Sequence, residues 1–380
     1  MKNDSITWLE ISSLALKHNI KQFIDNIPKS SKIMAVVKSN AYGHGLNESA
    51  RIFKQAGCHW LGTVNLDEAL ILRKNGIKGR ILVLSFYNPN RLVEAVKQGI
   101  TLTSYSLKSA QRLSKIGKKL NRIIKIHFKI DTGTSRLGLS PENAIVVLKK
   151  ISKLDNIIVE GIFTHFADAE NPNQSFTNKQ IRVFNQLTNN LEKQGINIPI
   201  KHLACSASTI LNSRSILNLV RIGISAYGLW SVENDSINYS ELRNKFNLKP
   251  ALSWYTKIIQ IKNINRGRSV GYGRSFKAKQ NLKIALIPVG YWDGYDRKLS
   301  NIGEVLISGK RCRVIGRICM NLCIIDIGRL KNVRTGDKVT LIGTDGKNTI
   351  TADELADKIN TINYEIVTRI NPNLPRIIIN

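Results

Sequence analysis

The chain has 380 residues, of which 42% are hydrophobic, and a formal net charge of +30 at pH 7. This length allows a large core and about two domains, and no apolar run approaches the ~20 residues that a membrane-spanning helix needs. The first six residues are polar and lack the apolar core of a signal peptide. We therefore expect a soluble cytoplasmic protein with no membrane partner.

The positive charge raises nucleic acid as a possible partner. However, the lysines are spread evenly, and apolar residues interrupt the longest basic clusters, 115–122 and 310–317. No nucleic-acid-binding motif accompanies them, so we expect no nucleic-acid partner, while attraction of small anions remains reasonable. Five cysteines without a secretory signal favour free thiols. Since Cys312, Cys319 and Cys323 lack partners at metal-ligand spacing, we expect no metal site.

A first helix begins near Ser12 or Ser13 and ends before Pro28. Apolar strands and amphipathic helices then alternate in eight β/α units within residues 10–238. Eight such units favour a (β/α)8 barrel; a doubly wound sheet would need a G-x-G-x-x-G after its first strand, and residues 39–45 supply none. The predicted strands are 33–37, 59–64, 80–84, 100–104, 122–130, 156–165, 200–204 and 219–222, and the predicted helices are 46–56, 66–75, 90–98, 107–120, 141–154 and 177–194.

After about residue 240 the long helical periods fade, and short β-rich runs follow between Gly and Asn turns. These predicted strands are 253–261, 282–288, 304–307, 311–315, 322–325 and 338–342. One helix is predicted at 351–359, with Thr351 as its cap and Glu354 at the capping-box position. The domain prediction is an N-terminal segment 1–9 that packs with the C-terminal domain, a barrel 10–238 and a β domain 239–380.

Polar residues follow five of the predicted barrel strands, where barrel enzymes place their chemistry. Lys38 ends the first strand, where low-dielectric walls make its ammonium costly and its amine nucleophilic; a lysine that simply reaches solvent is the alternative. Asp131 could form only a turn, and His165 could be a core histidine. Small residues after the last two strands favour phosphate binding. The full set is Lys38, Tyr42, Lys129, Asp131, Arg136, His165, Ser206, Arg221 and Gly223.

Eight motifs in order resemble those of the alanine racemase family, nearly from end to end of the chain. They are residues 35–45 (AVVKSNAYGHG), 129–133 (KIDTG) with 136–138 (RLG), 164–167 (THFA), 221–223 (RIG), 271–276 (GYGRSF), 290–294 (GYWDG), 319–320 (CM) and 361–364 (TINY). The resemblance implies a pyridoxal 5'-phosphate enzyme with a barrel and a β domain, acting as a homodimer. It also implies interconversion of L- and D-alanine, supplying D-alanine for peptidoglycan.

The resemblance implies two bases on opposite faces of the substrate. Lys38 would hold the cofactor as a Schiff base and then act as one base. Tyr272, from the β domain of a second subunit, would be the other, with His165 beside it and linked to Arg221. Arg221 would face the pyridine nitrogen, and because arginine keeps its proton, the ring would be a weaker electron sink, which favours racemisation over transamination.

The resemblance also implies binding roles for the remaining motif residues. The cofactor phosphate would be bound by Tyr42, Ser206, Gly223, Ile224 and Tyr364. Arg136 and the Met320 N–H would contact the substrate carboxylate, Lys129 occupies a position that is often carbamylated, and Tyr291, Trp292 and Asn321 would lie at the entrance. Five residues depart from the family pattern, Cys205, Ile222, Gly271, Trp292 and Asn321, and none of them is a predicted base.

Three other functions remain open at this stage, besides a basic nucleic-acid-binding protein, which a salt-sensitive DNA shift without alanine exchange would favour. One is a broad-specificity amino-acid racemase, and another is a pyridoxal-phosphate decarboxylase, which would more often carry an acidic residue in place of Arg221. The third is a non-catalytic, cofactor-carrying barrel protein. Such a protein needs no second domain, whereas this chain devotes residues 239–380 to one.

Overall fold

The computed structural model describes residues 4–232 and 239–380. Two compact units emerge: a barrel unit made of Ala15–Ala41 and Leu46–Pro250, and a β unit made of Met1–Leu14, Tyr42–Gly45 and Ala251–Asn380. The predicted domain boundary at residue 238 and the first three residues of the predicted N-terminal segment lie outside the described residues.

Eight parallel strands form the barrel in the spatial order β8-β7-β6-β5-β4-β3-β2-β9. The Arg221 N–H donates to the Ala204 carbonyl at 3.0 Å and so joins the two ends of this sheet. Strands that are apolar on both faces suit a sheet that helices cover on the outside, and the (β/α)8 prediction is confirmed. The strands are β2 (Lys32–Val36), β3 (Trp60–Thr63), β4 (Arg80–Val83), β5 (Thr101–Ser104), β6 (Ile124–Lys129), β7 (Ile157–Phe163), β8 (Ile200–His202) and β9 (Leu219–Ile222).

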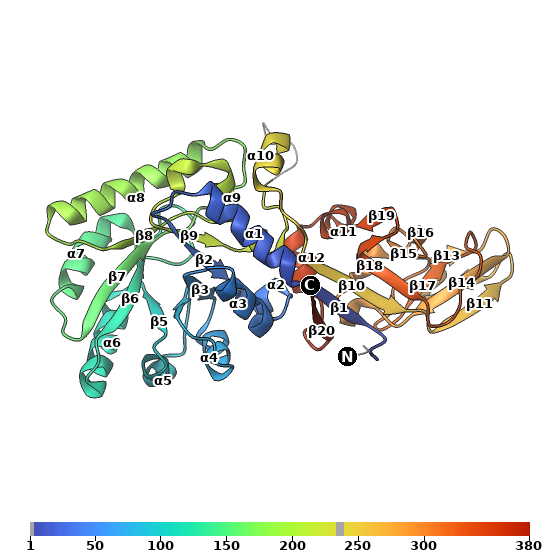
Figure 1. Cartoon of the computed structure of the whole chain (residues 1–380), viewed down its shortest axis with the longest axis horizontal. Coiled ribbons are helices and arrows are strands. Elements are labelled where there is room, and N and C mark those ends of the chain that lie inside the picture. The colour runs from blue at the N-terminus through green and yellow to red at the C-terminus, as the bar shows by residue number, and fades with distance from the viewer. Residues whose placement is uncertain (1–3, 233–238) are drawn as a thin grey trace. The chain divides into compact units, whose positions relative to one another are not determined.

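Figure 1 shows helices α3–α8 along the outside of these strands. Side-chain caps fix where several of them start: Asn65 accepts from the Glu68 N–H, and Ser106 accepts from the Ser109 N–H. The helices are α1 (Ser13–Asn26), α3 (Leu46–Gln55), α4 (Leu66–Lys74), α5 (Leu92–Lys97), α6 (Leu107–Leu120), α7 (Pro141–Ile151), α8 (Ser175–Lys193), α9 (Ser206–Leu211) and α10 (Tyr239–Phe246), with 3₁₀ turns at Pro89–Arg91, Ser213–Ser215 and Ile224–Tyr227.

Helix α10 belongs to the barrel unit, although the predicted β domain begins at 239. The Phe246 ring packs on Phe23 of α1 with centroids 5.2 Å apart. Asn19 of α1 also exchanges two hydrogen bonds with the backbone of Lys249, at 2.8 and 2.9 Å. These contacts keep the chain packed on the barrel as far as Pro250, and the last segment of the β unit begins at Ala251.

The β unit contains a seven-stranded sheet in the order β16-β15-β18-β10-β1-β20 with β19 beside β18, a three-stranded sheet β11-β14-β17, and the pair β12-β13. The prediction of a strand-rich second region is confirmed. Its strands are β1 (Trp8–Ser12), β10 (Leu252–Lys257), β11 (Gln260–Ile264), β12 (Ser269–Val270), β13 (Phe276–Lys277), β14 (Leu282–Ile287), β15 (Glu304–Ile307), β16 (Lys310–Arg313), β17 (Cys323–Asp326), β18 (Lys338–Asp345), β19 (Asn348–Ile350) and β20 (Arg376–Ile379).

Two features of these sheets differ from the sequence-based expectation. The predicted strand 253–261 is two strands, because the chain changes sheets: the Ile258 N–H donates to Asp337 at 3.0 Å and the Ile259 N–H to Leu286 at 2.9 Å. In addition, the N-terminal segment, which is expected to pack with the C-terminal domain, contributes a strand that is not predicted: β1 pairs with β10 in antiparallel and with β20 in parallel register.

Short helices complete the β unit. They are α11 (Ala352–Ile359) and α12 (Asn363–Thr368), with 3₁₀ turns at Tyr272–Arg274, Tyr291–Asp293 and Arg297–Leu299. Thr351 caps α11 by accepting from the Glu354 N–H at 3.0 Å. The Glu354 carboxylate does not complete a capping box but pairs with Arg311 and Lys358. Among the described residues, no helix has both the length and the apolar character that crossing a membrane requires.

Candidate active site at the barrel mouth

Lys38 stands where β2 ends, and it is followed by an unusual left-handed turn. Four consecutive residues, Ser39–Tyr42, have φ between 51° and 55°, a conformation that costs L-residues about 1–2 kcal/mol each. Glu68 of α4 holds the turn, because one of its oxygens accepts from the N–H groups of Ser39 and Asn40. The Asn40 side chain in turn caps α3 by accepting from the Leu46 N–H at 2.9 Å. Lys38 is thus held by tertiary contacts on its C-terminal side.

The environment of Lys38 favours the neutral amine. Burial lowers the pKa of Lys38, and the positive charge of Arg136 lowers it further, while Glu68 opposes both. A lysine with a lowered pKa is neutral, and therefore nucleophilic and basic, in a larger share of molecules.

The loop after β6 is built around Asp131. One carboxylate oxygen accepts from the N–H groups of Gly133, Thr134 and Ser135 at 2.9–3.1 Å, and the other accepts from the Arg136 N–H at 2.9 Å. Burial alone would raise the pKa of Asp131, but these four donors hold it below its ordinary value. Asp131 therefore organises a turn, and that turn positions Arg136.

Arg221 is a buried guanidinium whose hydrogen bonds go to neutral acceptors. It donates to Nδ1 and the carbonyl of His202, both at 2.9 Å. It also donates to the carbonyls of Thr164 and Leu203 at 2.8 and 2.7 Å, and lies 3.3 Å from His165 Nδ1. Burial lowers the pKa of Arg221 to about 10, so it remains charged at neutral pH, and none of these bonds neutralises it.

Two buried histidines continue inward from Arg221. Because Arg221 donates to His202 Nδ1, the proton of neutral His202 lies on Nε2. That nitrogen is 2.9 Å from His127 Nδ1, which must then accept, so the proton of His127 lies on Nε2. Among the described residues, His127 Nε2 has no hydrogen-bond partner. Burial lowers the pKa of His127 to about 3 and that of His202 well below its ordinary value, so both are neutral.

Two further predicted residues share this cationic field. Lys129 is 7% exposed, and burial followed by the charges of Arg221 and Arg136 lowers its pKa to about 8. Burial and then Arg221 lower the pKa of His165 well below its ordinary value. The structure therefore gathers Lys38, Lys129, Arg136 and Arg221 in one electrostatic neighbourhood at the barrel mouth.

The ends of β8 and β9 supply backbone donors. Ser206 begins α9, and its hydroxyl accepts from the Gly223 N–H at 2.9 Å, just before the 3₁₀ turn Ile224–Tyr227. Ser206 and Ile224 are buried. The first N–H groups of a helix have no partner within it, so this pair of helix starts suits an anionic group.

The remaining predicted residues belong to the β unit. There the rings of Tyr42 and Tyr364 lie 6.1 Å apart, and Arg376 donates to the Gly43 carbonyl at 3.0 Å. A side chain at Gly43 would meet the Val367 carbonyl at 2.0 Å, so glycine is required for this approach.

Three loops of the β unit meet one another. The Tyr291 and Trp292 N–H groups donate to the carbonyls of Cys319 and Met320 at 3.1 and 3.0 Å, and Gly273 lies against the Arg317 side chain. The predicted substrate-side residues on these loops, Tyr272, Tyr291, Trp292, Met320 and Asn321, are exposed. Tyr272 is 72% exposed.

Sequence reasoning missed Glu68, His127 and His202. The two histidines lie within or at the end of apolar strands, and a polar residue in a buried strand is itself a signal of a hydrogen-bond network. Glu68 carried no such signal, because an acidic residue in the first turn of a helix is ordinary.

Comparison with known proteins identifies the family that has this architecture. A model of alanine racemase N-terminal domains matches residues 11–231, and a model of alanine racemase C-terminal domains matches residues 251–378. A barrel followed by a strand-rich unit, matched by both models, is the architecture of an isomerase that racemises amino acids. The chain belongs to the alanine racemase family, which uses pyridoxal 5'-phosphate.

Individual relatives agree with this assignment. The alanine racemase of Methanococcus maripaludis is 43% identical over 97% of this chain and 98% of its own length. The structure of alanine racemase from Clostridium difficile 630 has a TM-score of 0.94 at 33% identity, covering 100% of this chain and 97% of that one. A histidine racemase from Leuconostoc mesenteroides is also similar, with a TM-score of 0.88 at 29% identity, covering 100% of this chain and 99% of that one.

Proposed function

We propose that the barrel mouth binds pyridoxal 5'-phosphate through Lys38 and that the chain racemises alanine there with two bases, Lys38 and Tyr272. The observation that carries this proposal is the lowered pKa of Lys38 in a mouth whose buried cation, Arg221, hydrogen-bonds within the described residues only to neutral acceptors. An amine that is neutral more often, beside an uncompensated positive charge, suits an aldehyde cofactor that carries negative charge.

The residues at the mouth fit this cofactor by their chemistry. Lys38 supplies the amine, and Arg221 supplies a charged donor for the pyridine nitrogen. The helix starts at Ser206, Gly223 and Ile224 would surround the phosphate, with the Gly223 N–H bonded to the Ser206 hydroxyl. We assign Tyr42 and Tyr364 to the phosphate as well. When bound, the cofactor supplies the electron sink that makes the α-proton of an amino acid removable.

Lys38 and Tyr272 then divide the proton transfers. Lys38 Nζ takes or returns the α-proton on one face of the substrate, and the Tyr272 hydroxyl of a second copy does so on the other. A phenol has an ordinary pKa near ~10 and needs cationic surroundings to act as a base at neutral pH. We infer that Arg221 provides the positive charge, that His165, which is neutral and lies 3.3 Å from Arg221, stands between Arg221 and Tyr272, and that the enzyme is a homodimer.

The buried arginine tunes the reaction toward racemisation. Arg221 keeps its proton at neutral pH, so it donates to the pyridine nitrogen without transferring a proton. The electron sink is weaker as a result, which disfavours transamination and decarboxylation.

The substrate carboxylate has two proposed donors, the Arg136 guanidinium and the Met320 N–H. Lys129 has a pKa lowered to about 8, so it offers the neutral amine that carbamylation requires. The carboxylate of the carbamylated side chain would then hold Arg136 in position. We assign Tyr291, Trp292 and Asn321 to the substrate entrance.

The first test is a coupled assay of D-alanine formation from L-alanine by the cofactor-free chain, with and without added pyridoxal 5'-phosphate. We expect activity only with the cofactor. Cofactor binding without any exchange of alanine would instead indicate a non-catalytic carrier. A panel of L-amino acids, histidine included because a histidine racemase is a structural neighbour, separates an alanine-specific enzyme from one of broad specificity.

The dimer proposal has its own test by complementation. Lys38→Ala and Tyr272→Phe chains are each expected to be inactive in racemisation. If each site combines residues of two copies, a mixed dimer has one intact site, so an equal mixture regains roughly a quarter of the wild-type activity, half of the dimers being mixed. No regain in a mixture shown to contain mixed dimers would contradict the shared site.

Two parts of the functional prediction concern the cell. We propose that the product D-alanine supplies peptidoglycan synthesis, which growth of a deletion strain with and without D-alanine would test. The cytoplasmic location stays a prediction, to be tested by fractionation.

A further inference from the structure

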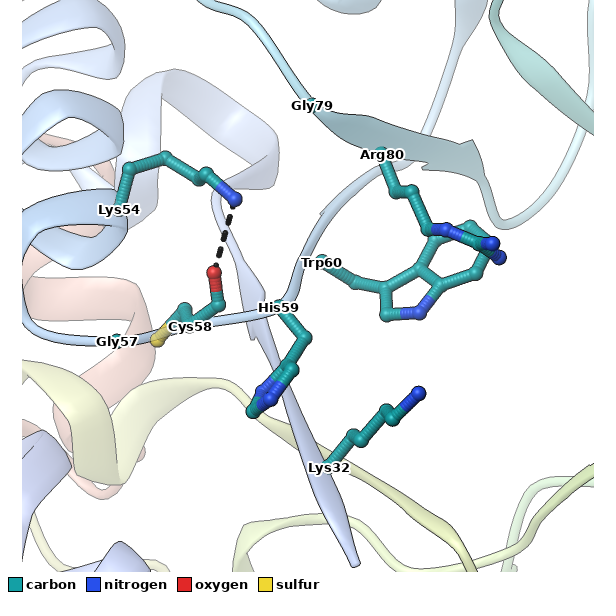
Figure 2. Close-up of a pocket in the computed structure, with 8 residues that line it drawn as sticks. All are labelled: Lys32, Lys54, Gly57, Cys58, His59, Trp60, Gly79 and Arg80. Carbon is teal, nitrogen blue, oxygen red and sulfur yellow. Dashed lines mark hydrogen bonds between the residues drawn. The ribbon is translucent and has the colours of Figure 1, made fainter.

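A cavity of about 350 Å³ lies at the floor of the barrel, where the strands begin. Its wall includes Lys32 and Arg80, the first residues of β2 and β4, and His59, which precedes β3. Lys38 follows the other end of β2, so this cavity and the barrel mouth are at opposite ends of the strands. Figure 2 shows the cationic side chains of Lys32, Lys54 and Arg80 with His59 and Trp60 around this cavity.

Two of the cations around the cavity, Arg80 and Lys54, are held in place by the fold. The guanidinium of Arg80 lies over the Trp60 ring, 4.9 Å from its centroid, and donates to Glu160 at 2.7 Å. Lys54 Nζ donates to the Cys58 carbonyl at 3.0 Å. A Cβ at Gly79 would lie only 3.0 Å from Lys54 Nζ, so glycine at this position leaves room for the Lys54 ammonium group.

The positive charge of the cavity is only partly neutralised. No carboxylate is among the residues that line it, and neither Lys32 nor Lys54 forms an ion pair with any described residue. Glu160 pairs with Arg80 but also with Lys125, at 3.4 Å. Burial, together with the charges of Lys32 and Lys54, lowers the pKa of His59, which shows that the positive field reaches the imidazole.

We propose that this floor cavity is a binding site for the phosphate group of a small anion. A phosphate offers several acceptor oxygens and negative charge to the ammonium groups of Lys32 and Lys54, to the His59 ring and to the free side of Arg80. A cavity of about 350 Å³ has room for a phosphate with a small organic part. The net charge of +30 raises the local concentration of such anions. The site is separate from the cofactor phosphate site at the mouth.

The test uses the holoenzyme, so that the mouth already holds its cofactor. Inorganic phosphate and glycerol phosphate are titrated by calorimetry at constant ionic strength. We expect saturable binding that weakens about tenfold in Lys32→Gln and in Lys54→Gln, since each removes one charge contact worth about 1.4 kcal/mol. Lys149→Gln, on the exposed face of α7, removes a surface charge elsewhere and should change affinity less than twofold. Circular dichroism checks that each variant is folded.

A spectroscopic readout on His59 accompanies the titration. Bound phosphate should raise the pKa of the His59 imidazole, followed by NMR, in the wild type and not in the Lys32→Gln/Lys54→Gln double variant. Equal affinity for the two ligands identifies a site for free phosphate, and tighter binding of glycerol phosphate identifies one for phosphomonoesters. Absence of saturable binding, or equal weakening in Lys149→Gln, would overturn the proposal.

Discussion

The arginines at the two ends of the barrel lie in opposite environments. At the floor, the Arg80 side chain is 49% exposed and pairs with Glu160. At the mouth, Arg221 is 5% exposed, and its hydrogen-bond partners in the described part of the chain are all carbonyls and histidines. A buried charge without a counter-charge is costly, so its persistence at the mouth indicates a place that an anionic ligand completes. At the floor, by contrast, Glu160 of the same chain already compensates part of the Arg80 charge.

A column of side chains inside the barrel joins these two ends. Arg80 lies over Trp60, whose ring is 5.0 Å from that of His127. His127 bonds to His202, which bonds to Arg221. The middle of the column is neutral because burial lowers the pKa of both histidines. Charge is therefore confined to the two ends, and each end can be perturbed separately.

The largest expected effect is at the mouth. Lys38→Ala should lower kcat at least ~10³-fold and remove the visible absorbance of the bound cofactor, because the nucleophilic amine is lost. Lys38→Arg keeps the charge but not the amine and should fail equally. Exposed Lys29→Ala is the control, with kcat within about twofold of wild type. Substantial activity in Lys38→Arg would show that the mouth needs only a positive charge there.

The next effect concerns packing in the middle of the column. A Cβ at Gly161 would lie 2.5 Å from His127 Nδ1, so Gly161→Ala must displace the histidine and should lower the free energy of unfolding by about 3 kcal/mol. Gly195→Ala is the control: unlike Gly161, Gly195 has a positive φ, +76°, but nothing lies within 4 Å of an added Cβ, so only the strain of about 1 kcal/mol is expected. Urea unfolding of both variants measures the difference. Equal losses would mean that His127 is not fixed where the structure has it.

Acid should destabilise the column through its histidines. The pKa of His127 is lowered from 6.5 to about 3 in the folded state, so the unfolded chain takes up this proton first. Its contribution to stability is therefore present above pH 6.5 and is lost as the pH falls toward 3. Between pH 7 and 5 this one histidine should remove about 2 kcal/mol from the free energy of unfolding.

The measurement is urea unfolding at several pH values for the wild type and for His127→Asn. The variant should show a shallower loss of stability between pH 7 and 5, whatever its stability at pH 7. His165 and His202 also have lowered pKa values, so a residual slope is expected. An unchanged slope would mean that His127 is not neutral in the folded state at pH 5.

The sequence predicted the barrel because its strands are apolar on both faces and its helices carry caps, as Asn65 and Ser106 show. Strand β1 escaped prediction because its partners, β10 and β20, lie more than 200 residues away. Such pairing is set by long-range contacts rather than by local pattern.

The candidate site likewise has residues that the sequence could identify and features that only the structure shows. Lys38, Arg136 and Arg221 could be named because polar residues at strand ends stand out and the motifs matched a family. The left-handed turn at Ser39–Tyr42 could not, because Glu68 imposes it from another helix. Nor could the protons of His127 and His202 be placed, since they follow from Arg221 only once the distances are known.

The smallest effect is expected at the floor of the barrel. It tests whether Arg80 is in fact less isolated from water than Arg221. Arg80→Gln removes the pair with Glu160 but leaves Lys125 beside that carboxylate. Because the Arg80 side chain is half exposed, the free energy of unfolding should fall by only about 0.5–1 kcal/mol. The difference should shrink in 1 M salt, where exposed charges are screened within about 3 Å. A loss of several kcal/mol that salt does not change would mean that the floor arginine is as isolated from water as the one at the mouth.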